Sequence, residues 1–520
     1  MPKVTVTSGL VSSVVRTAAI LIGVAVLLSL FLIPTSNHSP ANPSHLLFHS
    51  HRLFENPGRA ACGEALVRNP IIPNDRGSND FEKMWFVRNM TKHAWAGYHR
   101  LASGSDELKP LSGKAYNWYD QHSLLSTAID SLDTLLIMGL TEEYAQAKSE
   151  VLSKFNPTFN DEVSVFESTI RVVAGLLSAY ELDGDVKLLN AAKWMADRLL
   201  PAFETPTGIP LNRFFDRSAG LAEAGTLSLE LQYLSDALFA MEQIFAAKRR
   251  LPHLYPSVVS AKFLSFENEN YGIGAGLDSF YEYLLKMWIA TGDPGYWARY
   301  EGAITTIKKM IVAVSDDGQN VYIPDFFRNI DSLGFHHLTC FSGGMLGLGS
   351  ILNRRGRWPE NLNMGKRITE TCYRSYQKAS SGLGPEVVDG NDLSAVSPSY
   401  LQRPETVESI FYMWRLTHDP VYREWGWDIA QNGYASLGNV NSVVIGSNGI
   451  VHPPTLIDRQ ESFLIAETLK YLYLLFTDDD VVPLEKYVFN TEGHPLSIRG
   501  HGKRKDPTLF VPLHGHALFP

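Results

Sequence analysis

Apolar residues between positions 81 and 480 recur with a helical period, in long segments separated by Gly-Asp and Asp-Pro turns. Seven of these segments begin near an acidic or small polar cluster and continue as an apolar helix. Most are followed by a more polar amphipathic helix, as at 185–200 and 296–311. The apolar segments are IDSLDTLLIMGL (129–140), VFESTIRVVAGLLSAY (165–180), LSLELQYLSDAL (227–238), LDSFYEYLLKMWIATGD (277–293), TCFSGGMLGLGS (339–350), ETVESIFYMWRLTHD (405–419) and ESFLIAETLKYLYLLF (461–476).

An apolar helix that alternates with an amphipathic one predicts an inner ring of helices wrapped by an outer ring. We therefore predict an all-α fold, a toroid of about seven helical hairpins, with an irregular bundle or a solenoid as the alternatives. Acidic groups at the starts of successive inner helices favour the closed ring, because closure would point them at one cavity. Strand-like pieces such as 439–447 are expected to form small β-hairpins at the rim.

The segment 17–33 is an uncharged apolar run that ends at Pro34, with Lys3 and Arg16 before it. Its length is at the lower limit for spanning a bilayer, and the preceding basic residues predict a cytosolic N-terminus. We therefore expect a cytosolic tail at 1–16 and a transmembrane signal-anchor at 17–33, a single-pass type II arrangement. A cleaved signal peptide is the alternative. A short span suits the thinner membranes of the early secretory pathway.

The remaining chain is expected to comprise a lumenal stem at 34–80, a catalytic domain at 81–500 and a C-terminal tail at 501–520. Two glycosylation sequons begin at Asn37 and Asn89, which is compatible with a lumenal location. The chain has three cysteines, so one disulfide and one free thiol is the simplest arrangement. We favour a bond between Cys340 and Cys372, both in the main domain, which leaves the state of Cys62 open.

Composition narrows the possible functions. Hydrophobic residues make up 45% of the chain and charged residues 19%, enough apolar material for a large core. The net charge is −9 and no long basic stripe occurs, which argues against nucleic acid as a partner. The sequence has no H-E-x-x-H motif or paired C-x-x-C motifs of a zinc site, and no G-x-S-x-G or phosphate-loop motif. With these motifs absent, carboxylates are the candidate catalytic groups.

Eleven acidic residues lie on the apolar segments and their connecting loops. For any one of them, a helix cap, a helix-dipole partner or an internal salt bridge is the simpler interpretation. As a set they exceed what capping requires, and pairs at helical spacing share a face, where mutual repulsion would raise a pKa. Carboxylates in a lumenal protein rich in aromatic residues indicate cleavage of a glycosidic bond. The acids are Asp130, Asp133, Glu167, Glu230, Asp278, Glu282, Glu386, Glu405, Glu408, Glu461 and Glu467.

These segments carry a resemblance to a known family. IDSLDTL, VFESTIRV, LDSFYEYLLK, HLTCF (337–341), GLGPE (382–386), RPETVES (403–409), ESFLIAETLKYLYLLF and FNTEGHPL (489–496) resemble, in the same order, motifs of the class I α-1,2-mannosidases, glycoside hydrolase family 47. The resemblance covers roughly residues 85–500. It implies an (α/α)7 barrel, inversion at the anomeric carbon, and one bound Ca²⁺ at the barrel floor.

The resemblance also implies roles for individual residues. Glu167 matches the general acid and Glu405 the general base, while Asp278 and Glu386 match further active-site carboxylates. Thr491 matches the direct protein ligand of the calcium, and Cys340 with Cys372 the disulfide pair. Residues that match groups holding the sugar or the calcium's waters are Asp130, Glu230, Glu282, Glu408, Phe463, Glu467 and Glu492, of which Phe463 would pack on the mannose ring.

The implied function is removal of α-1,2-linked mannose from high-mannose N-glycans, by a monomer in the membrane of the endoplasmic reticulum or Golgi. A glycan-binding quality-control protein with weak or no catalysis is the main alternative, and an unrelated α/α-barrel hydrolase a second one. A departure from the pattern occurs at Gly276, where members of the endoplasmic reticulum usually carry arginine and Golgi members a bulkier apolar residue. This departure leaves the preferred mannose branch undetermined.

Overall fold

The computed structural model describes residues 78–498 except for 120–121, 159–161, 214–215, 217, 233–234, 325–333, 353–357, 434, 443, 446–450 and 453. The described residues all belong to one unit, Gly58–Pro520. The predicted tail, anchor and C-terminal tail lie outside the described residues, as do Asn37, Cys62 and nearly all of the stem. Within the described part of the chain, no helix is long and apolar enough to cross a membrane.

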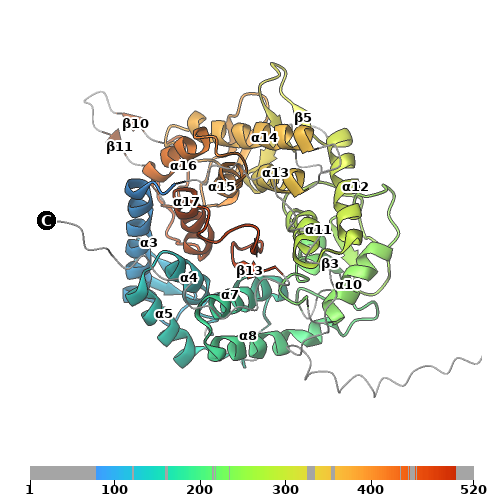
Figure 1. The fold of residues 1–520 in the computed structure, drawn as a ribbon, viewed down its shortest axis with the longest axis horizontal. Coiled ribbons are helices and arrows are strands. Elements are labelled where there is room, and N and C mark those ends of the chain that lie inside the picture. Colours follow the sequence, from blue (N-terminus) through green and yellow to red (C-terminus); the bar gives the residue numbers. More distant parts are fainter. Residues whose placement is uncertain are drawn as a thin grey trace, which may run out of the picture. The chain divides into compact units, whose positions relative to one another are not determined.

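Helices of the described unit alternate between two concentric rings, as Figure 1 shows. The sequence therefore predicted the ring correctly, and the fold is an (α/α)7 barrel. The outer helices are α3 (Phe81–Ala102), α5 (Thr141–Lys154), α8 (Val186–Leu199), α10 (Ser235–Ala246), α12 (Pro294–Met310), α14 (Trp358–Lys378) and α16 (Val421–Gln431). The inner positions hold α4 (Ser126–Ile137), α6 (Val165–Glu167) with η2 (Ser168–Val173) and α7 (Ala174–Asp183), α9 (Leu221–Gly225), α11 (Asp278–Thr291), α13 (Phe341–Leu352), α15 (Glu405–Thr417), and η5 (Leu464–Thr468) with α17 (Leu469–Leu475).

Burial differs between the two rings in the way that the apolar pattern predicts. In the inner helix α4, every residue except Leu136 is buried. In the outer helix α5, which follows directly, the buried residues are Glu143, Tyr144, Ala147, Glu150 and Val151, one face only. An inner helix is covered on all sides, whereas an outer helix buries a single stripe and exposes the rest.

Glycine and aspartate at the turns explain where consecutive helices end and begin. Gly184 ends α7 with a φ of 80°, a left-handed conformation that only glycine adopts readily. The next residue, Asp185, caps α8 by accepting a hydrogen bond from the backbone N–H of Lys187 at 2.9 Å. Gly292 and Asp293 repeat this arrangement between α11 and α12. The sequence therefore predicted these hairpin turns correctly.

The prediction of an inner helix at 227–238, the third apolar segment, is wrong. The inner helix α9 ends at Gly225, residues 226–232 form turns, and Ser235 begins the outer helix α10. Leu227, Leu229 and Leu231 are all buried in these turns. An apolar run indicates that a segment is buried, but its periodicity alone does not distinguish a buried turn from a buried helix.

Short antiparallel hairpins join the helices. The predicted strand within 439–447 is present as β10 (Val444–Ile445), which pairs with β11 (Val451–His452). The hairpin that matters for the site consists of β12 (Tyr487–Phe489) and β13 (Pro495–Ser497). Figure 1 shows β13 at the centre of the ring of helices, so the turn at 490–494 lies where the inner helices converge.

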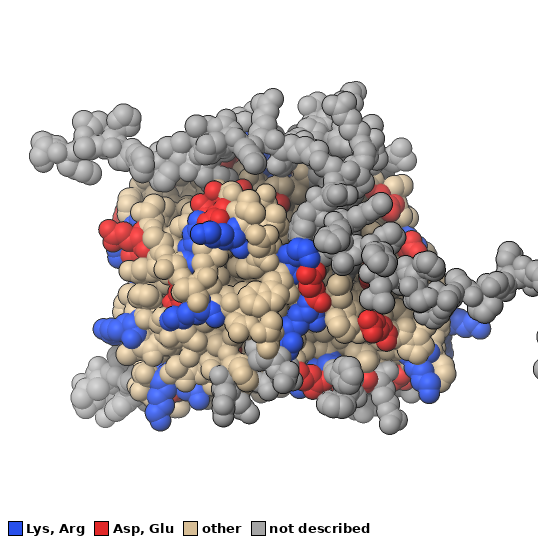
Figure 2. All heavy atoms as spheres, turned by 90° about the horizontal axis from the view of Figure 1, so that it is seen from below, with Lys and Arg blue, Asp and Glu red and all other residues tan. Residues whose placement is uncertain are grey.

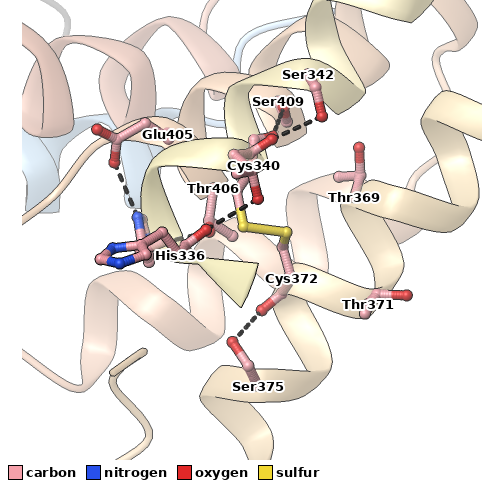
Figure 3. The surroundings of a disulfide bond; sticks show 12 residues. His336, Cys340, Ser342, Thr369, Thr371, Cys372, Ser375, Glu405, Thr406 and Ser409 are labelled. Carbon is pink, nitrogen blue, oxygen red and sulfur yellow. Dashed lines mark hydrogen bonds and ion pairs between the residues drawn. A yellow bond between two sulfur atoms is a disulfide. The ribbon is translucent and has the colours of Figure 1, made fainter. Parts of the chain in front are cut away.

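The predicted disulfide is confirmed. Cys340 and Cys372 are bonded, with their Cα atoms 6.0 Å apart, and the bond joins η4 (His337–Cys340) to α14. Figure 3 shows the bond beside α15, from which Ser409 donates a hydrogen bond to the carbonyl oxygen of Cys340. The disulfide therefore fixes η4 to α14, and the Ser409 hydrogen bond joins η4 to the helix that begins with Glu405.

Surface charge is mixed on the face of the molecule drawn in Figure 2. Lysine and arginine side chains lie among aspartate and glutamate side chains there, and apolar and neutral polar residues separate them.

Candidate active site

Several of the predicted acids lie near the ends of inner helices or in the turn of the central hairpin. Glu167 ends α6, Asp278 begins α11, Glu405 begins α15, and Glu467 lies in η5. Glu492 lies in the hairpin turn between β12 and β13. The hydrogen bonds, ion pairs and electrostatic interactions described below connect these residues into one site.

Arg171 joins acids from three different elements. Its Nε donates to Glu167 at 2.7 Å, and its Nη1 forms an ion pair with Glu492 and lies 3.8 Å from the Asp130 carboxylate. Burial opposes the charge of Arg171, but the surrounding carboxylates raise its pKa well above its ordinary value. Arg171 is therefore a permanent cation that holds α4, α6 and the hairpin turn together.

Beneath Arg171 lies a set of ion pairs that is closed to solvent. The His494 ring contacts Asp133 through Nδ1 at 2.8 Å and Asp130 through Nε2 at 3.3 Å. Lys470 lies 2.9 Å from Asp133 and also donates to the Gly493 carbonyl at 2.6 Å. Although burial opposes the charge, Lys470 and His494 hold the pKa of Asp133 below its usual range. For Asp133, the salt-bridge interpretation is correct.

Glu405 is held from two sides. Its carboxylate lies 2.8 Å from Nδ1 of His337, and Figure 3 shows it at the start of α15. Because a carboxylate only accepts hydrogen bonds, Nδ1 must donate. Burial opposes the charge on Glu405, but the hydrogen bond and charge of His337, and the charge of Arg403, lower its pKa. Arg403 also donates through Nε to both carboxylate oxygens of Glu386, at 2.8 and 2.7 Å.

Asp278 lies in the opposite electrostatic environment. Burial, together with repulsion from Glu405 and Glu282, raises the pKa of Asp278 to about 7. Two neighbouring carboxyl groups thus have pKa values displaced in opposite directions, one toward the ionised form and one toward the protonated form. This separation is characteristic of sites that carry out acid–base chemistry near neutral pH.

Three further acids extend the site between the helices. Glu282 forms an ion pair with Lys286 one turn along α11. Burial and repulsion from Glu282 raise the pKa of Glu408, and burial with repulsion from Glu492, Glu405 and Glu408 raises the pKa of Glu467. These interactions connect the acids of α11, α15 and η5 to the hairpin turn, as the sequence predicted.

Thr491 lies in that turn beside Glu230. The Thr491 backbone N–H donates to the hydroxyl of Tyr283 at 3.3 Å, and this hydroxyl donates to Oε1 of Glu230 at 2.5 Å. Asn490 donates to the same Oε1 atom at 2.9 Å, whereas Oε2 of Glu230 is buried without a hydrogen-bond partner. Burial raises the pKa of Glu230 to about 7.

The residues around Thr491 fit a hard cation. The groups are oxygen donors, and the orphaned Glu230 oxygen would gain from positive charge or from a cation-bound water. Within the described ranges, no three or more His, Cys, Asp or Glu side chains are grouped to hold a metal ion directly. Thr491 as the single direct ligand, with waters held by the acids, would satisfy both observations.

Aromatic rings lie against the acid network. The guanidinium of Arg171 is 5.7 Å from the ring centroids of both Phe463 and Trp118. Phe463, predicted to pack on a sugar, is partly exposed and precedes η5. A flat apolar ring gives the C–H face of a pyranose a surface to pack on, and the neighbouring carboxylates can bind its hydroxyl groups.

Sequence reasoning assigned no role to the basic partners of the acids. His337, Arg171, Arg403, His494 and Lys470 bind the carboxylates, but only tertiary structure brings them into contact. His337 and His494 stand inside the quoted motifs HLTCF and FNTEGHPL, and Arg171 lies four residues after Glu167. That i,i+4 spacing is a helical salt-bridge signal that could have identified Arg171.

Gly276 lies two residues before Asp278, which begins α11. Its φ is +79°, and a Cβ atom added there would meet nothing within 4 Å. Space is therefore available beside Asp278, but the left-handed backbone disfavours other residues.

Comparison with known proteins agrees with this geometry. Residues 90–498 match the model of glycosyl hydrolase family 47. The chain is 37% identical over 485 residues to a mannosyl-oligosaccharide α-1,2-mannosidase IA of Drosophila melanogaster, covering 83% of this chain and 71% of that protein. It is 34% identical to an endoplasmic reticulum mannosyl-oligosaccharide 1,2-α-mannosidase of Rattus norvegicus, covering 83% of this chain and 69% of that protein.

A solved structure with the same architecture is that of an α-1,2-mannosidase from Trichoderma reesei. Its TM-score is 0.73 at 28% identity, over 81% of this chain and 100% of that chain. The family match and the two relatives cover most of this chain, and the structure matches over the same fold. On these grounds the chain belongs to glycosyl hydrolase family 47.

Proposed function

We propose that this chain hydrolyses α-1,2-linked mannose from high-mannose N-glycans of glycoproteins in the secretory pathway. The names of its relatives support the substrate and the linkage. The observation that carries the proposal is the convergence of Glu167 and Glu405 on one acid network, which runs through Arg171, Glu492 and Glu467. Two carboxyl groups on different elements of one site are what glycosidic cleavage requires.

In the proposed mechanism, Glu167 in its protonated form gives its proton to the glycosidic oxygen while ionised Glu405 takes a proton from water. The water oxygen bonds to the anomeric carbon from the opposite face as the carbon–oxygen bond to the leaving sugar breaks, which inverts the anomeric configuration. His337 and Arg403 keep Glu405 ionised and therefore able to accept a proton. Asp278, protonated up to about pH 7, is a second carboxyl that can hold or pass a proton beside Glu405.

We infer further that the cofactor is Ca²⁺, bound through the Thr491 hydroxyl. The support is the oxygen-rich surroundings of Thr491 and the orphaned Glu230 oxygen. When bound, the ion would polarise sugar hydroxyls and offset the repulsion between the buried acids. The roles of Glu230, Glu282, Glu408, Glu467 and Glu492 would then be to hold the waters and hydroxyls that complete the shell.

We also propose that residues 17–33 anchor the chain in the endoplasmic reticulum or Golgi membrane, with the catalytic domain in the lumen. Support comes from the apolar run, from the preceding Lys3 and Arg16, and from the disulfide, which suits an oxidising compartment. Protease protection of the full chain in microsomes tests this arrangement. Digestion of the catalytic domain in intact microsomes would refute it.

The central experiment incubates a fragment of residues 34–520 with a nine-mannose glycan, with and without chelator. We expect release of one or more terminal mannose residues in calcium, initially as the β-anomer by NMR, and loss of release after thorough metal removal. Mapping the shortened glycan identifies the preferred branch. The enzyme assignment fails if no mannose is released in calcium, and the calcium assignment fails if release persists without metal.

A further inference from the structure

The outer helix α3 carries a glycosylation sequon whose structural setting is informative. Asn89 is exposed on α3, and Met90 and Thr91, the other two residues of the sequon, are buried. Figure 1 shows α3 in the outer ring, so its exposed face points away from the barrel interior. Asn89 is thus accessible on the outer wall and remote from the acid network.

Two large aromatic side chains are exposed one helical turn before Asn89. Trp85 is 48% exposed and Phe86 is 41% exposed. They precede Asn89 by four and three residues, and residues at these spacings share one helical face. Long side chains on a helix lean toward its N-terminus, so a group attached to Asn89 would lie over Trp85 and Phe86.

Both aromatic rings are held in place from below. Arg88 donates to the carbonyl oxygens of Met138 and Gly139, and its guanidinium lies 4.6 Å from the Trp85 ring centroid. Phe86 contacts Trp427 of α16 edge-on, with ring centroids 5.0 Å apart. These contacts hold the rings in place, and their exposed parts form an apolar platform on the outer wall.

We propose that Asn89 carries an N-linked glycan whose first sugar packs on Trp85 and Phe86. The apolar C–H face of a pyranose suits the electron-rich face of an aromatic ring, and the sugar would shield apolar surface from water. The proposal depends on the lumenal location proposed above. It assigns the exposed rings to a group attached to the chain itself.

The position of Thr91 fixes when the transfer occurs. Its side chain is fully buried, and its hydroxyl donates to the Val87 carbonyl at 3.1 Å. The acceptor motif is therefore closed once α3 has folded against the barrel, so Asn89 is modified on the nascent chain. In the transfer, Asn89 Nδ2 bonds to the anomeric carbon of the sugar, that carbon's bond to a lipid-diphosphate donor breaks, and the amide proton is released.

The first test is mass spectrometry of the full chain made in eukaryotic cells, with and without N-glycosidase. We expect a glycan on the peptide that contains Asn89, absent in Asn89→Gln, and no transfer to the folded protein made without glycans. An unmodified Asn89 with a glycan at Asn37 overturns this proposal alone. A chain unmodified at both positions and absent from microsomes overturns the proposed location as well.

The second test measures whether the sugar packs on the rings. Endoglycosidase trimming to a single sugar should leave Tm unchanged, because the first sugar remains on the rings. Asn89→Gln removes that sugar and should lower Tm by about 1–3 °C, a small shift because the domain is large. In a Trp85→Ser/Phe86→Ser background, Asn89→Gln should have less than half of that effect. Equal effects in both backgrounds would overturn the packing, and so would a Tm that falls fully on trimming.

Discussion

At the residue scale, the site depends on basic side chains that contact acidic side chains at short range. His337 lies against Glu405, Arg403 against Glu386, and Arg171 against Glu167. Each cation is partly or fully buried, so its interaction with the acid is weakly screened by water. For Glu405 these neighbours outweigh burial and lower the pKa below that of a free glutamate.

The proposed base can be tested by Glu405→Gln. An amide cannot accept a proton from the attacking water, so we expect kcat to fall by about 10²–10⁴-fold. Glycan binding should survive, because the amide fills the same space. Mannose release and calorimetric binding measure the two effects, with the exposed Glu142→Gln on α5 as the matched control. Retained turnover in Glu405→Gln would reassign the base.

His337→Gln tests how the protonation of Glu405 is controlled. His337 lowers the pKa of Glu405, so its removal should raise that pKa. The base would then remain protonated to higher pH, and the acidic limb of the kcat/KM profile should shift upward in pH. A profile that falls uniformly at all pH values, without a shift, would show that His337 acts on structure alone.

At the scale of elements, a disulfide and a set of buried ion pairs fix the positions of the helices that carry the site. The disulfide fixes η4 to α14 beside the start of α15, and the ion pairs around Asp133 join α4, α17 and the central hairpin turn. The first constrains the chain by a covalent link. The second does so by charges that no longer have access to water.

The double variant Cys340→Ser/Cys372→Ser should be less stable than the native chain. The bond closes a loop with a sequence separation of 32 residues. For a loop of this length, chain entropy predicts a loss of about 3–4 kcal/mol in the free energy of unfolding. Denaturant titration of the oxidised protein and the variant gives the difference. An unchanged midpoint would mean that packing alone positions η4.

Lys470→Met should destabilise the protein more strongly than a surface substitution. It leaves the buried Asp133 with one cationic partner fewer, for which a cost of about 3–5 kcal/mol is typical. Lys148→Met, which removes ion pairs to Asp183 and Asp185 at the surface, should cost at most about 1 kcal/mol. Similar thermal shifts in the two variants would contradict this ranking.

At the scale of the whole molecule, the buried acids make stability depend on pH and, through the proposed calcium ion, on metal. Burial raises the pKa values of Glu230, Asp278 and Glu461 to about 7. In the unfolded chain such carboxyls ionise near pH 4. Between about pH 4 and 7 the folded state retains protons that the unfolded state releases, so these groups contribute stability at low pH that is lost as the pH rises through 7.

In the chelated protein, the contribution of these acids to the free energy of unfolding should therefore fall as the pH rises from 5 to 8. Calcium should stabilise the protein more at pH 8 than at pH 5, because a cation favours the ionised carboxylates. Thermal unfolding across this range, with calcium or with chelator, measures both trends. A calcium-dependent rise in Tm that is larger at pH 5 than at pH 8 would contradict this account.

The sequence by itself determined the alternation of inner and outer helices, their turns, the disulfide pair and the acids of the site. The helices, turns and acids follow from local patterns, namely a period of 3.6 residues, Gly-Asp turns, and a charge placed within an apolar run. The disulfide pair followed from the count of three cysteines and from the family resemblance. The ordered motifs added predicted roles for Glu167, Glu405 and Thr491, which no local pattern indicates.

Only the tertiary structure decided which cation meets which carboxylate, and where a buried turn replaces a helix. His337 and Glu405 are 68 residues apart in sequence, and Asp130 and His494 are 364 apart. The turn at 226–232 is as apolar as a helix because both are surrounded by protein. Long-range pairing depends on how the whole ring closes, and that closure is a property of all the helices together.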